Sequence, residues 1–234
     1  NSFTNAMYTA IGDAFLDAET NPAVKAVLLK GHETCFSAGN DLGDFLNNPP
    51  TTLQAPVFRF LRAIAAFSKP VVAQVAGVAV GIGTTMLLHC DLVYASSTAK
   101  FSMPFVKLGL CPEAASSLLF PRLSGYQKAT EWLLLGDMFS AQKASEAGIV
   151  TDVLAPESLD AHVQAQIKKV LDLPLAGLIT TKRLMKSHSD AAVSKIMAEE
   201  GEMFMSMIPQ APAQEAFRAF GEKRAPNFKQ FEQQ

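Results

Sequence analysis

Apolar residues in the first half of the chain alternate between the spacing of a helix and the continuous run of a buried strand. Met7, Ile11 and Phe15 recur at every fourth position, which predicts an amphipathic helix over residues 5–19. Residues 23–30, AVKAVLLK, form an almost unbroken apolar run that is typical of a buried strand. Because the two patterns alternate, the sequence predicts an α/β fold.

Helical spacing dominates the second half of the chain. The predicted strands are 23–30, 71–75, 92–95, 100–102 and 149–154. The predicted helices are 5–19, 57–67, 84–89, 114–120, 126–135, 141–147, 157–172, 175–187, 190–206 and 212–223. Residues 43–56 are polar and contain prolines, so we expect a mobile loop there. We divide the chain into a core, residues 1–175, and a C-terminal helical region, residues 176–234.

Composition excludes several classes of protein. The 234 residues are 49% apolar and 18% charged, with a net charge of −2. Ordinary domains carry about 25% charged residues, so this chain can bury a large core and has no electrostatic footprint for nucleic acid or an anionic membrane. The most apolar stretch, residues 70–96, is interrupted by Gln74, His89 and Asp91 and does not predict a membrane span. We therefore expect neither nucleic acid nor a membrane as a partner.

Cysteine and histidine usage predicts no disulfide and no metal. Cys35, Cys90 and Cys111 are odd in number and widely spaced, which favours a reducing compartment. The histidines form no ligand set, and His89 lies in a predicted buried helix, as a core histidine would. The chain shows no secretory signal, so we expect a cytoplasmic protein, with a removed organellar signal left open.

A glycine-rich segment separates two predicted elements. Gly77, Gly81 and Gly83 do not complete a dinucleotide-binding GxGxxG pattern, because position 86 is Met86. What remains is a sharp turn that feeds a helix N-terminus, where free N–H groups and the helix dipole favour negative charge. The turn could hold a phosphate, stabilise an oxyanion, or serve only tight strand–helix packing.

A second turn, FSAGND at residues 36–41, follows the first predicted strand. Small residues around Gly39 let the chain bend sharply and expose a backbone N–H. One N–H from this turn and one from residues 81–83 would make a two-donor oxyanion hole. Taken alone, the segment is equally compatible with an ordinary β–α turn.

Taken in order, these segments resemble a known family. FSAGNDL, KPVVAQVAGVAVGIGTTMLLHCDLVYAS and KFSMPFVKLGLCPEAASSLLFPRLSG resemble the crotonase (enoyl-CoA hydratase/isomerase) superfamily. The resemblance continues through LLLGDMFSAQKASEAGIVTDVL and AFGEKRAPNF, so it covers nearly the whole chain. It implies a crotonase-like spiral of ββα repeats with a C-terminal helical trimerisation region, and an acyl-CoA thioester as substrate. It also implies a homotrimer or a dimer of trimers, no cofactor beyond the CoA of the substrate, and one or two family strands before residue 1.

The superfamily binds the thioester oxygen with two backbone N–H groups. Carried over by motif, these belong to Asn40 and Ile82. Because backbone atoms provide the hydrogen bonds, the Asn and Ile side chains leave the device intact. One such donor contributes about 3–4 kcal/mol in mutational tests on other enzymes.

The acid and base positions separate the branches of the superfamily. Hydratases use two glutamates, and the matching positions here are Thr85 and Phe105, which disfavours standard hydration. Glu113 precedes an apolar helix, where an acidic residue is also common for structural reasons. Its position resembles the single catalytic glutamate of the peroxisomal-type Δ3,Δ2-enoyl-CoA isomerase branch. One carboxylate can carry a proton from C2 to C4, and Phe105 and Leu110 would exclude water and raise the pKa of Glu113.

The resemblance also implies contacts with CoA. The turn residues expected to contact the adenine are Ala38, Asp41 and Leu42. Phe220 and Lys223 are expected near the adenine and the 3′-phosphate of the same or a neighbouring subunit. From the residues alone, Asp41 is also a candidate loop cap and Asp91 a structural residue. The remaining acidic cluster, Glu199, Glu200 and Glu202, is expected on a solvated or intersubunit helix face.

The sequence therefore favours a Δ3,Δ2-enoyl-CoA isomerase and leaves two alternatives. The first is an enoyl-CoA hydratase or another crotonase reaction, which the absent carboxylates at Thr85 and Phe105 disfavour. The second is a non-catalytic acyl-CoA-binding paralogue, which the presence of Glu113 disfavours.

Overall fold

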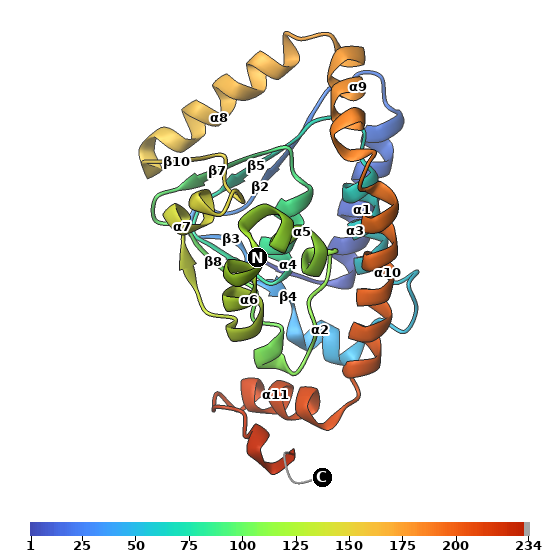
Figure 1. Cartoon of the computed structure of the whole chain (residues 1–234), viewed down its shortest axis with the longest axis vertical. Coiled ribbons are helices and arrows are strands. Elements are labelled where there is room, and N and C mark those ends of the chain that lie inside the picture. The colour runs from blue at the N-terminus through green and yellow to red at the C-terminus, as the bar shows by residue number, and fades with distance from the viewer. Residues whose placement is uncertain (232–234) are drawn as a thin grey trace.

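The computed structural model describes residues 1–231 and is built around two four-stranded sheets (Figure 1). The first sheet is parallel throughout, in the order β10 (Asp152–Leu154), β7 (Leu92–Ser96), β5 (Val71–Val75) and β2 (Val27–Lys30). The second has the order β3 (Cys35–Ser37), β6 (Val78–Val80), β8 (Lys100–Ser102) and β9 (Phe139–Ser140), with β9 antiparallel. A short parallel pair joins β1 (Ser2–Phe3) to β4 (Gly39–Asn40).

The chain passes three times from the first sheet to the second, which gives it a spiral course. β2, β5 and β7 lie in the first sheet, and each is followed by a strand of the second sheet, β3, β6 and β8. Gly77 makes the step from β5 to β6 possible, because its φ is +69° and a Cβ atom there would lie 2.0 Å from the Thr34 carbonyl. The expected α/β spiral of ββα repeats is confirmed.

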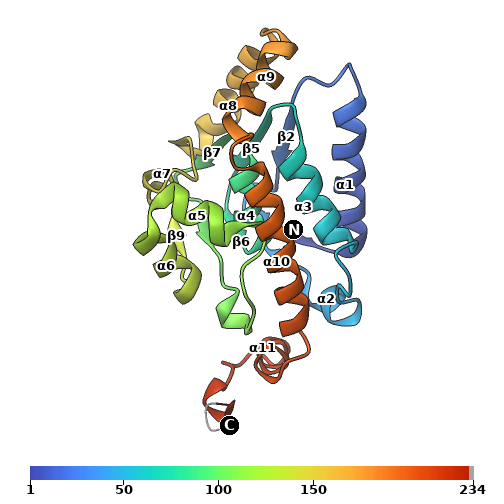
Figure 2. The same cartoon turned by 45° about the vertical axis from the view of Figure 1, so that its right-hand side comes forward.

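Helices cover the sheets. They are α1 (Asn5–Thr20), α2 (Leu42–Asn47), α3 (Pro56–Ala66), α4 (Ile82–Thr85), α5 (Ser116–Ser124), α6 (Tyr126–Leu135), α7 (Ala141–Glu146), α8 (Pro156–Leu171), α9 (Leu175–Lys186), α10 (Asp190–Met207) and α11 (Ala211–Gly221). Helices α1 and α3 lie side by side, and α10 runs along the length of the molecule (Figure 2). The predicted C-terminal helices begin and end within two residues of these bounds; residues 232–234 of the predicted C-terminal region lie outside the described residues.

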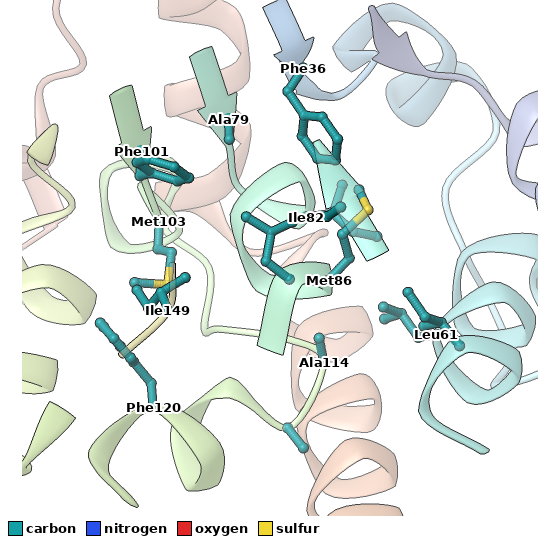
Figure 3. Packing of buried hydrophobic residues seen from close by; sticks show 14 of the residues in the cluster. Phe36, Leu61, Ala79, Ile82, Met86, Phe101, Met103, Ala114, Phe120 and Ile149 are labelled. Carbon is teal, nitrogen blue, oxygen red and sulfur yellow. The ribbon is translucent and has the colours of Figure 1, made fainter. Parts of the chain in front are cut away.

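The main core lies between the second sheet and the helices that follow it. Ile82 of α4 and Met86 of the 3₁₀ turn that follows, together called the α4 segment (residues 82–89), point into it, with Phe101, Phe120 and Ala114 around them (Figure 3). All five side chains are at most 2% exposed. The α4 segment is therefore a rigid, fully packed base for the turn before it.

Several sequence predictions are wrong in detail. In α1 the predicted apolar face is right at Phe15, which is 2% exposed, and at Ile11, which packs against the core, but wrong at Met7, which is 43% exposed where Tyr8 is buried. The expected loop over residues 43–56 contains most of α2, capped by Asp41. The glycine-rich turn contains β6, and the helix predicted over 84–89 begins at Ile82 and ends in a 3₁₀ turn. The strands predicted over 23–30 and 149–154 are shorter than expected.

Candidate active site

The two turns singled out in the sequence are packed against each other through glycines. Gly39 has a φ of +86°, and a Cβ atom there would lie 2.9 Å from the Val80 carbonyl oxygen. A Cβ atom on Gly83 would lie 2.8 Å from the carbonyl oxygen of Ser37, whose hydroxyl accepts a hydrogen bond from the Gly39 N–H at 3.1 Å. Only glycine allows backbones to approach this closely. The expected meeting of Asn40 and Ile82 is therefore built into the packing.

Ile82 opens α4 directly after a glycine in the left-handed region. Gly81 has a φ of +56°, and its carbonyl oxygen accepts hydrogen bonds from the N–H groups of Thr84 and Thr85 at 2.9 and 3.0 Å. The first N–H groups of a helix have no acceptor within the helix, so the Ile82 N–H is of the kind that binds an oxyanion. A Cβ atom on Gly81 would meet nothing within 4 Å, which places Gly81 on an open wall.

A cavity of about 560 Å³ lies in front of these two turns. Its wall includes most of the residues that the sequence predicted for substrate: Ala38, Asn40, Asp41, Leu42, Ile82, Phe105, Leu110 and Phe220. Lys223 is exposed beyond the end of α11 and does not line the cavity. Glu113 is buried and is not on the cavity wall either. The sequence thus located the cavity almost completely.

Three aromatic residues on the cavity wall were not predicted. Phe45, Phe204 and Phe217 come from α2, α10 and α11, and the Phe45 ring centroid lies 6.0 Å from each of the other two. Phe204 also meets Phe105 at 6.4 Å. The C-terminal helices therefore cover the cavity with apolar surface. Their helical spacing reads as ordinary core packing, so the sequence carried no signal for this role.

Asp41 has the loop-capping role that the residues alone suggested. Its carboxylate accepts hydrogen bonds from the Asp44 N–H at 3.0 Å and from the Ser2 hydroxyl at 2.8 Å. These hydrogen bonds lower the pKa of Asp41 below its ordinary value. The side chain therefore fixes the direction in which the chain leaves Asn40.

Glu113 is held on a strained loop. It is followed by Ala114 and Ala115, whose φ angles of 64° and 54° lie in the left-handed region that non-glycine residues avoid. Because Ala114 and Ala115 do not have helical angles, α5 begins at Ser116 and not at residue 114 as predicted. The loop is fixed by His89, whose Nε2 donates to the Ala114 carbonyl at 2.8 Å, and by the Ser116 hydroxyl, which donates to the Glu113 carbonyl at 2.6 Å. Paired outliers of this kind are found at functional sites.

The Glu113 carboxyl is 1% exposed, and neither oxygen has a hydrogen-bond partner among residues 1–231. Burial, followed by the charge of Glu200, raises its pKa to about 8. Burial also lowers the pKa of His89 to about 4, so His89 is neutral and serves to hold the loop, as a core histidine. A carboxyl with a pKa near neutrality in a dry setting has the properties of a general base.

Tyr8 is hydrogen-bonded to the turn that holds Asn40 and is affected electrostatically by Glu113. Its hydroxyl donates to the Asn40 side-chain oxygen at 2.5 Å. Burial raises the pKa of Tyr8 well above its ordinary value, and the charge of Glu113 raises it further, so the phenol lies within reach of the carboxyl's field. The sequence analysis missed Tyr8, because the spacing of apolar residues pointed to its neighbour Met7, which is 43% exposed.

The sequence profile of the family described as enoyl-CoA hydratase/isomerase matches residues 1–233. The chain belongs to the enoyl-CoA hydratase/isomerase family. The resemblance read from the motifs is therefore confirmed.

Relatives in this family cover nearly all of the chain. The 1,2-epoxyphenylacetyl-CoA isomerase of Escherichia coli K12 is 33% identical over 97% of this chain and 90% of that protein. The peroxisomal enoyl-CoA delta isomerase 3 of the mouse is 32% identical over 94% of this chain and 71% of that protein. The structure of Pseudomonas aeruginosa OdaA superposes with a TM-score of 0.91 at 42% identity, covering 94% of this chain and 89% of that one.

The two positions that the sequence analysis matched to the hydratase glutamates carry no carboxylate in this structure. Thr85 is fully buried with its hydroxyl oxygen unpartnered among the described residues, and Phe105 presents a ring to the cavity. Residues 1–231 contain no group of three or more side chains that could hold a metal ion. No helix in the same range is both long and apolar enough to span a membrane. Asp41 and Lys107 are ionisable residues of the cavity wall, and Glu113 lies three residues after Leu110 of that wall with a raised pKa and with no hydrogen-bond partner among residues 1–231.

Proposed function

We propose that this chain moves the 3,4 double bond of an acyl-CoA to the 2,3 position, with Glu113 as the single proton carrier. The observation that carries the proposal is the buried carboxyl of Glu113, unpartnered among residues 1–231, on a strained loop that begins three residues earlier at Leu110 of the cavity wall. The replacement of both hydratase glutamates by Thr85 and Phe105 supports it. The family includes both hydratases and isomerases, and these three positions favour isomerisation.

The reaction balances with one carboxylate. Ionised Glu113 removes a proton from C2, and the electrons of the broken C–H bond form a dienolate whose negative charge rests on the thioester oxygen. The thioester C=O then re-forms, and the electron pair between C1 and C2 becomes the double bond between C2 and C3. The electron pair of the former 3,4 double bond takes the proton from Glu113 at C4. The carboxylate is regenerated, and no second acid or water is consumed.

The dienolate oxygen would be held by the backbone N–H groups of Asn40 and Ile82. Both residues line the cavity, and the glycine contacts between their turns fix the distance between them. Preorganised donors stabilise charge at the moment it develops, without reorganisation of the site. The apolar ring formed by Phe45, Phe105 and Phe204 would exclude water and so protect the intermediate.

The test is to supply the protein with a trans-3-enoyl-CoA and, separately, with a trans-2-enoyl-CoA, and to follow the absorbance of the conjugated thioester. We expect the absorbance to rise with the first substrate and to stay constant with the second. Glu113→Gln should lower the isomerase kcat by a factor of about 10²–10⁴, the usual contribution of a general base. Glu199→Gln, a change at an exposed glutamate of α10, is the matched control and should leave the rate unchanged.

Two results would contradict the proposal. A falling absorbance with the 2-enoyl substrate would mean hydration without the usual glutamate pair. Wild-type isomerase activity in Glu113→Gln would remove Glu113 from the reaction.

A further inference from the structure

A second buried carboxyl lies next to Glu113, contributed by the C-terminal region. Glu200 of α10 is 7% exposed, although the sequence places it among acidic neighbours expected on a solvated or intersubunit face. Its Oε1 accepts a hydrogen bond from the Ser117 N–H at 2.9 Å, and its backbone oxygen accepts one from the Cys111 thiol at 3.7 Å. Cys111 and Ser117 flank Glu113 in the chain. Glu200 is therefore fastened to the Glu113 loop on both sides.

The two carboxyl groups face a region without compensating polar partners. Both oxygens of Glu113 and the Oε2 of Glu200 have no hydrogen-bond partner among residues 1–231. The other titratable groups around them are Tyr8 of α1, Cys111 of the preceding loop and His89, whose proton is directed to the Ala114 carbonyl. None of these groups brings a positive charge. The geometry thus concentrates two acids in a buried space where one negative charge is already costly.

We propose that Glu200 is a positioning residue for Glu113: anchored by the Ser117 N–H and buried against the loop that carries Glu113, its carboxylate disfavours a second negative charge on Glu113 and so keeps that residue protonated at rest. This inference rests on the proposed function, in which Glu113 is the base. A second negative charge in the same buried region is disfavoured by the first, as in other carboxylate pairs. Burial raises the pKa of Glu200 too, but the Ser117 N–H opposes that shift by favouring the ionised form. Glu113 has no such donor among residues 1–231, so of the two groups it holds the proton more readily.

Glu113 is therefore a stronger base, and the fraction of it that is ionised depends on pH. The charge of Glu200 adds to burial in raising the pKa of Glu113. Ionised Glu113 is therefore scarce at pH 7 but takes up the C2 proton more readily than an isolated carboxylate would. We expect kcat/KM to rise with pH and to level off above about pH 8.

The decisive variant is Glu200→Gln, which keeps the shape of the side chain and an oxygen for the Ser117 N–H. The C=O stretching band of protonated Glu113 is titrated by infrared spectroscopy in the free protein and is assigned by its loss in Glu113→Gln. We expect the midpoint of this band to fall by about one pH unit or more in Glu200→Gln. The acid limb of kcat/KM should shift the same way, so that the activity of the variant relative to wild type is about tenfold higher at pH 6 than at pH 9.

Two controls keep the test decisive. Glu199→Gln removes an exposed charge from the neighbouring position of α10 and should leave both midpoints unchanged. If Glu200→Gln does not fold, Glu200→Met removes the charge with an apolar side chain of similar length, a replacement that buried ionic groups often tolerate. An infrared midpoint of Glu113 that is the same in wild type and in the folded Glu200 variant would overturn the inference.

The two readouts also separate this inference from the proposed function. If neither enoyl-CoA reacts but the infrared midpoint shifts, the carboxyl pair stands and the isomerase assignment fails. If isomerisation is observed and the midpoint does not move, Glu113 acts alone and the role given to Glu200 is wrong.

Discussion

Lys182 and Glu113 are both buried ionisable side chains, yet their surroundings are opposite. The Lys182 ammonium donates to Asp91 at 2.7 Å and to the Lys69 carbonyl at 2.8 Å, and the same Asp91 oxygen accepts the Val71 N–H at 2.7 Å. The carboxyl of Glu113 has no such partner among the described residues, and the charged residue that raises its pKa, Glu200, has the same sign.

The difference separates a structural charge from a reactive one. A buried ion that is fully hydrogen-bonded locks its elements together, and here Lys182 ties α9 to the start of β5. A buried ion without partners remains free to exchange a proton, at a cost to stability that the rest of the fold carries. Glu113 follows the second pattern, which is why it, and neither Asp91 nor His89, is the candidate base.

Breaking the structural site should have the largest effect on stability. Lys182→Met would leave Asp91 without its cation; because the Asp91 side chain is 24% exposed, the cost should lie near the low end of the about 3–5 kcal/mol found for fully buried pairs. We expect a loss of this order in the free energy of unfolding, measured by urea denaturation. The double variant Lys182→Met, Asp91→Asn should recover part of it. A single variant as stable as wild type would show that the pair contributes nothing.

Removing the charge of Glu113 should raise the free energy of unfolding at high pH, whereas removing the charge of Lys182 should lower it. The pKa of Glu113 is about 8 in the folded protein and lower in the unfolded chain, so the folded state binds more protons between these values. Stability therefore falls as the pH rises from the unfolded pKa toward 8, and the full cost is present above 8. Glu113→Gln should be more stable than wild type by about 2–4 kcal/mol at pH 9, from about 1.4 kcal/mol per pKa unit less the cost of burying the amide.

The comparison of melting curves at pH 5 and pH 9 checks this prediction. At pH 5 both proteins carry a neutral side chain at position 113, so their stabilities should be close. An advantage of Glu113→Gln that is the same at both pH values would indicate a packing effect rather than a titration.

The strands differ in how well they could be predicted from the sequence. β5 and β8 were predicted with the observed bounds, since their buried residues form compact runs. The strands β1, β3, β4, β6 and β9 were missed: each is two or three residues long and is defined by pairing with a distant strand, and β8 and β10 are the strands of that length that were predicted among the described residues. Short strands carry no periodicity of their own, so only tertiary structure reveals them.

The candidate site was predictable where it depends on the backbone and less so where it depends on side-chain environment. The turns that hold Asn40 and Ile82 are marked by glycines, and the cavity forms where the motifs indicated. The burial of Glu200 was not predictable, because in the run of Glu199, Glu200 and Glu202 only the packing of α10 decides which residue faces inward. Tyr8 was missed for the same reason, because only the packing of α1 shows that it, and not Met7, faces inward.

Disturbing the contact between the two turns should reduce activity more than stability. In Gly83→Ala the new Cβ atom would lie 2.8 Å from the Ser37 carbonyl oxygen and push the turns apart. Overpacking of this kind costs about 1–3 kcal/mol, and the loss of one oxyanion donor's alignment should lower kcat by up to about 10²-fold. Gly177→Ala in α9 meets nothing within 4 Å and is the control, expected to be neutral or slightly stabilising. Equal kcat values in the two variants would contradict the assignment of the turns.

The smallest predicted effect on activity concerns the hydrogen bond from Tyr8 to Asn40. Tyr8→Phe removes the hydroxyl that donates to Asn40 but retains the ring stacked on Phe3 at 4.9 Å. A buried acceptor left without its donor costs about 1–3 kcal/mol, so we expect a loss of unfolding free energy at the low end of this range. The side-chain amide of Asn40 is then free to rotate, and a small misplacement of a group at the site lowers the rate. We therefore expect kcat/KM to fall a few-fold. Tyr126→Phe, at a ring 72% exposed, is the control and should change neither quantity. If the two variants behave alike, Tyr8 is only a core aromatic residue, and the side chain of Asn40 is set by the backbone of its turn.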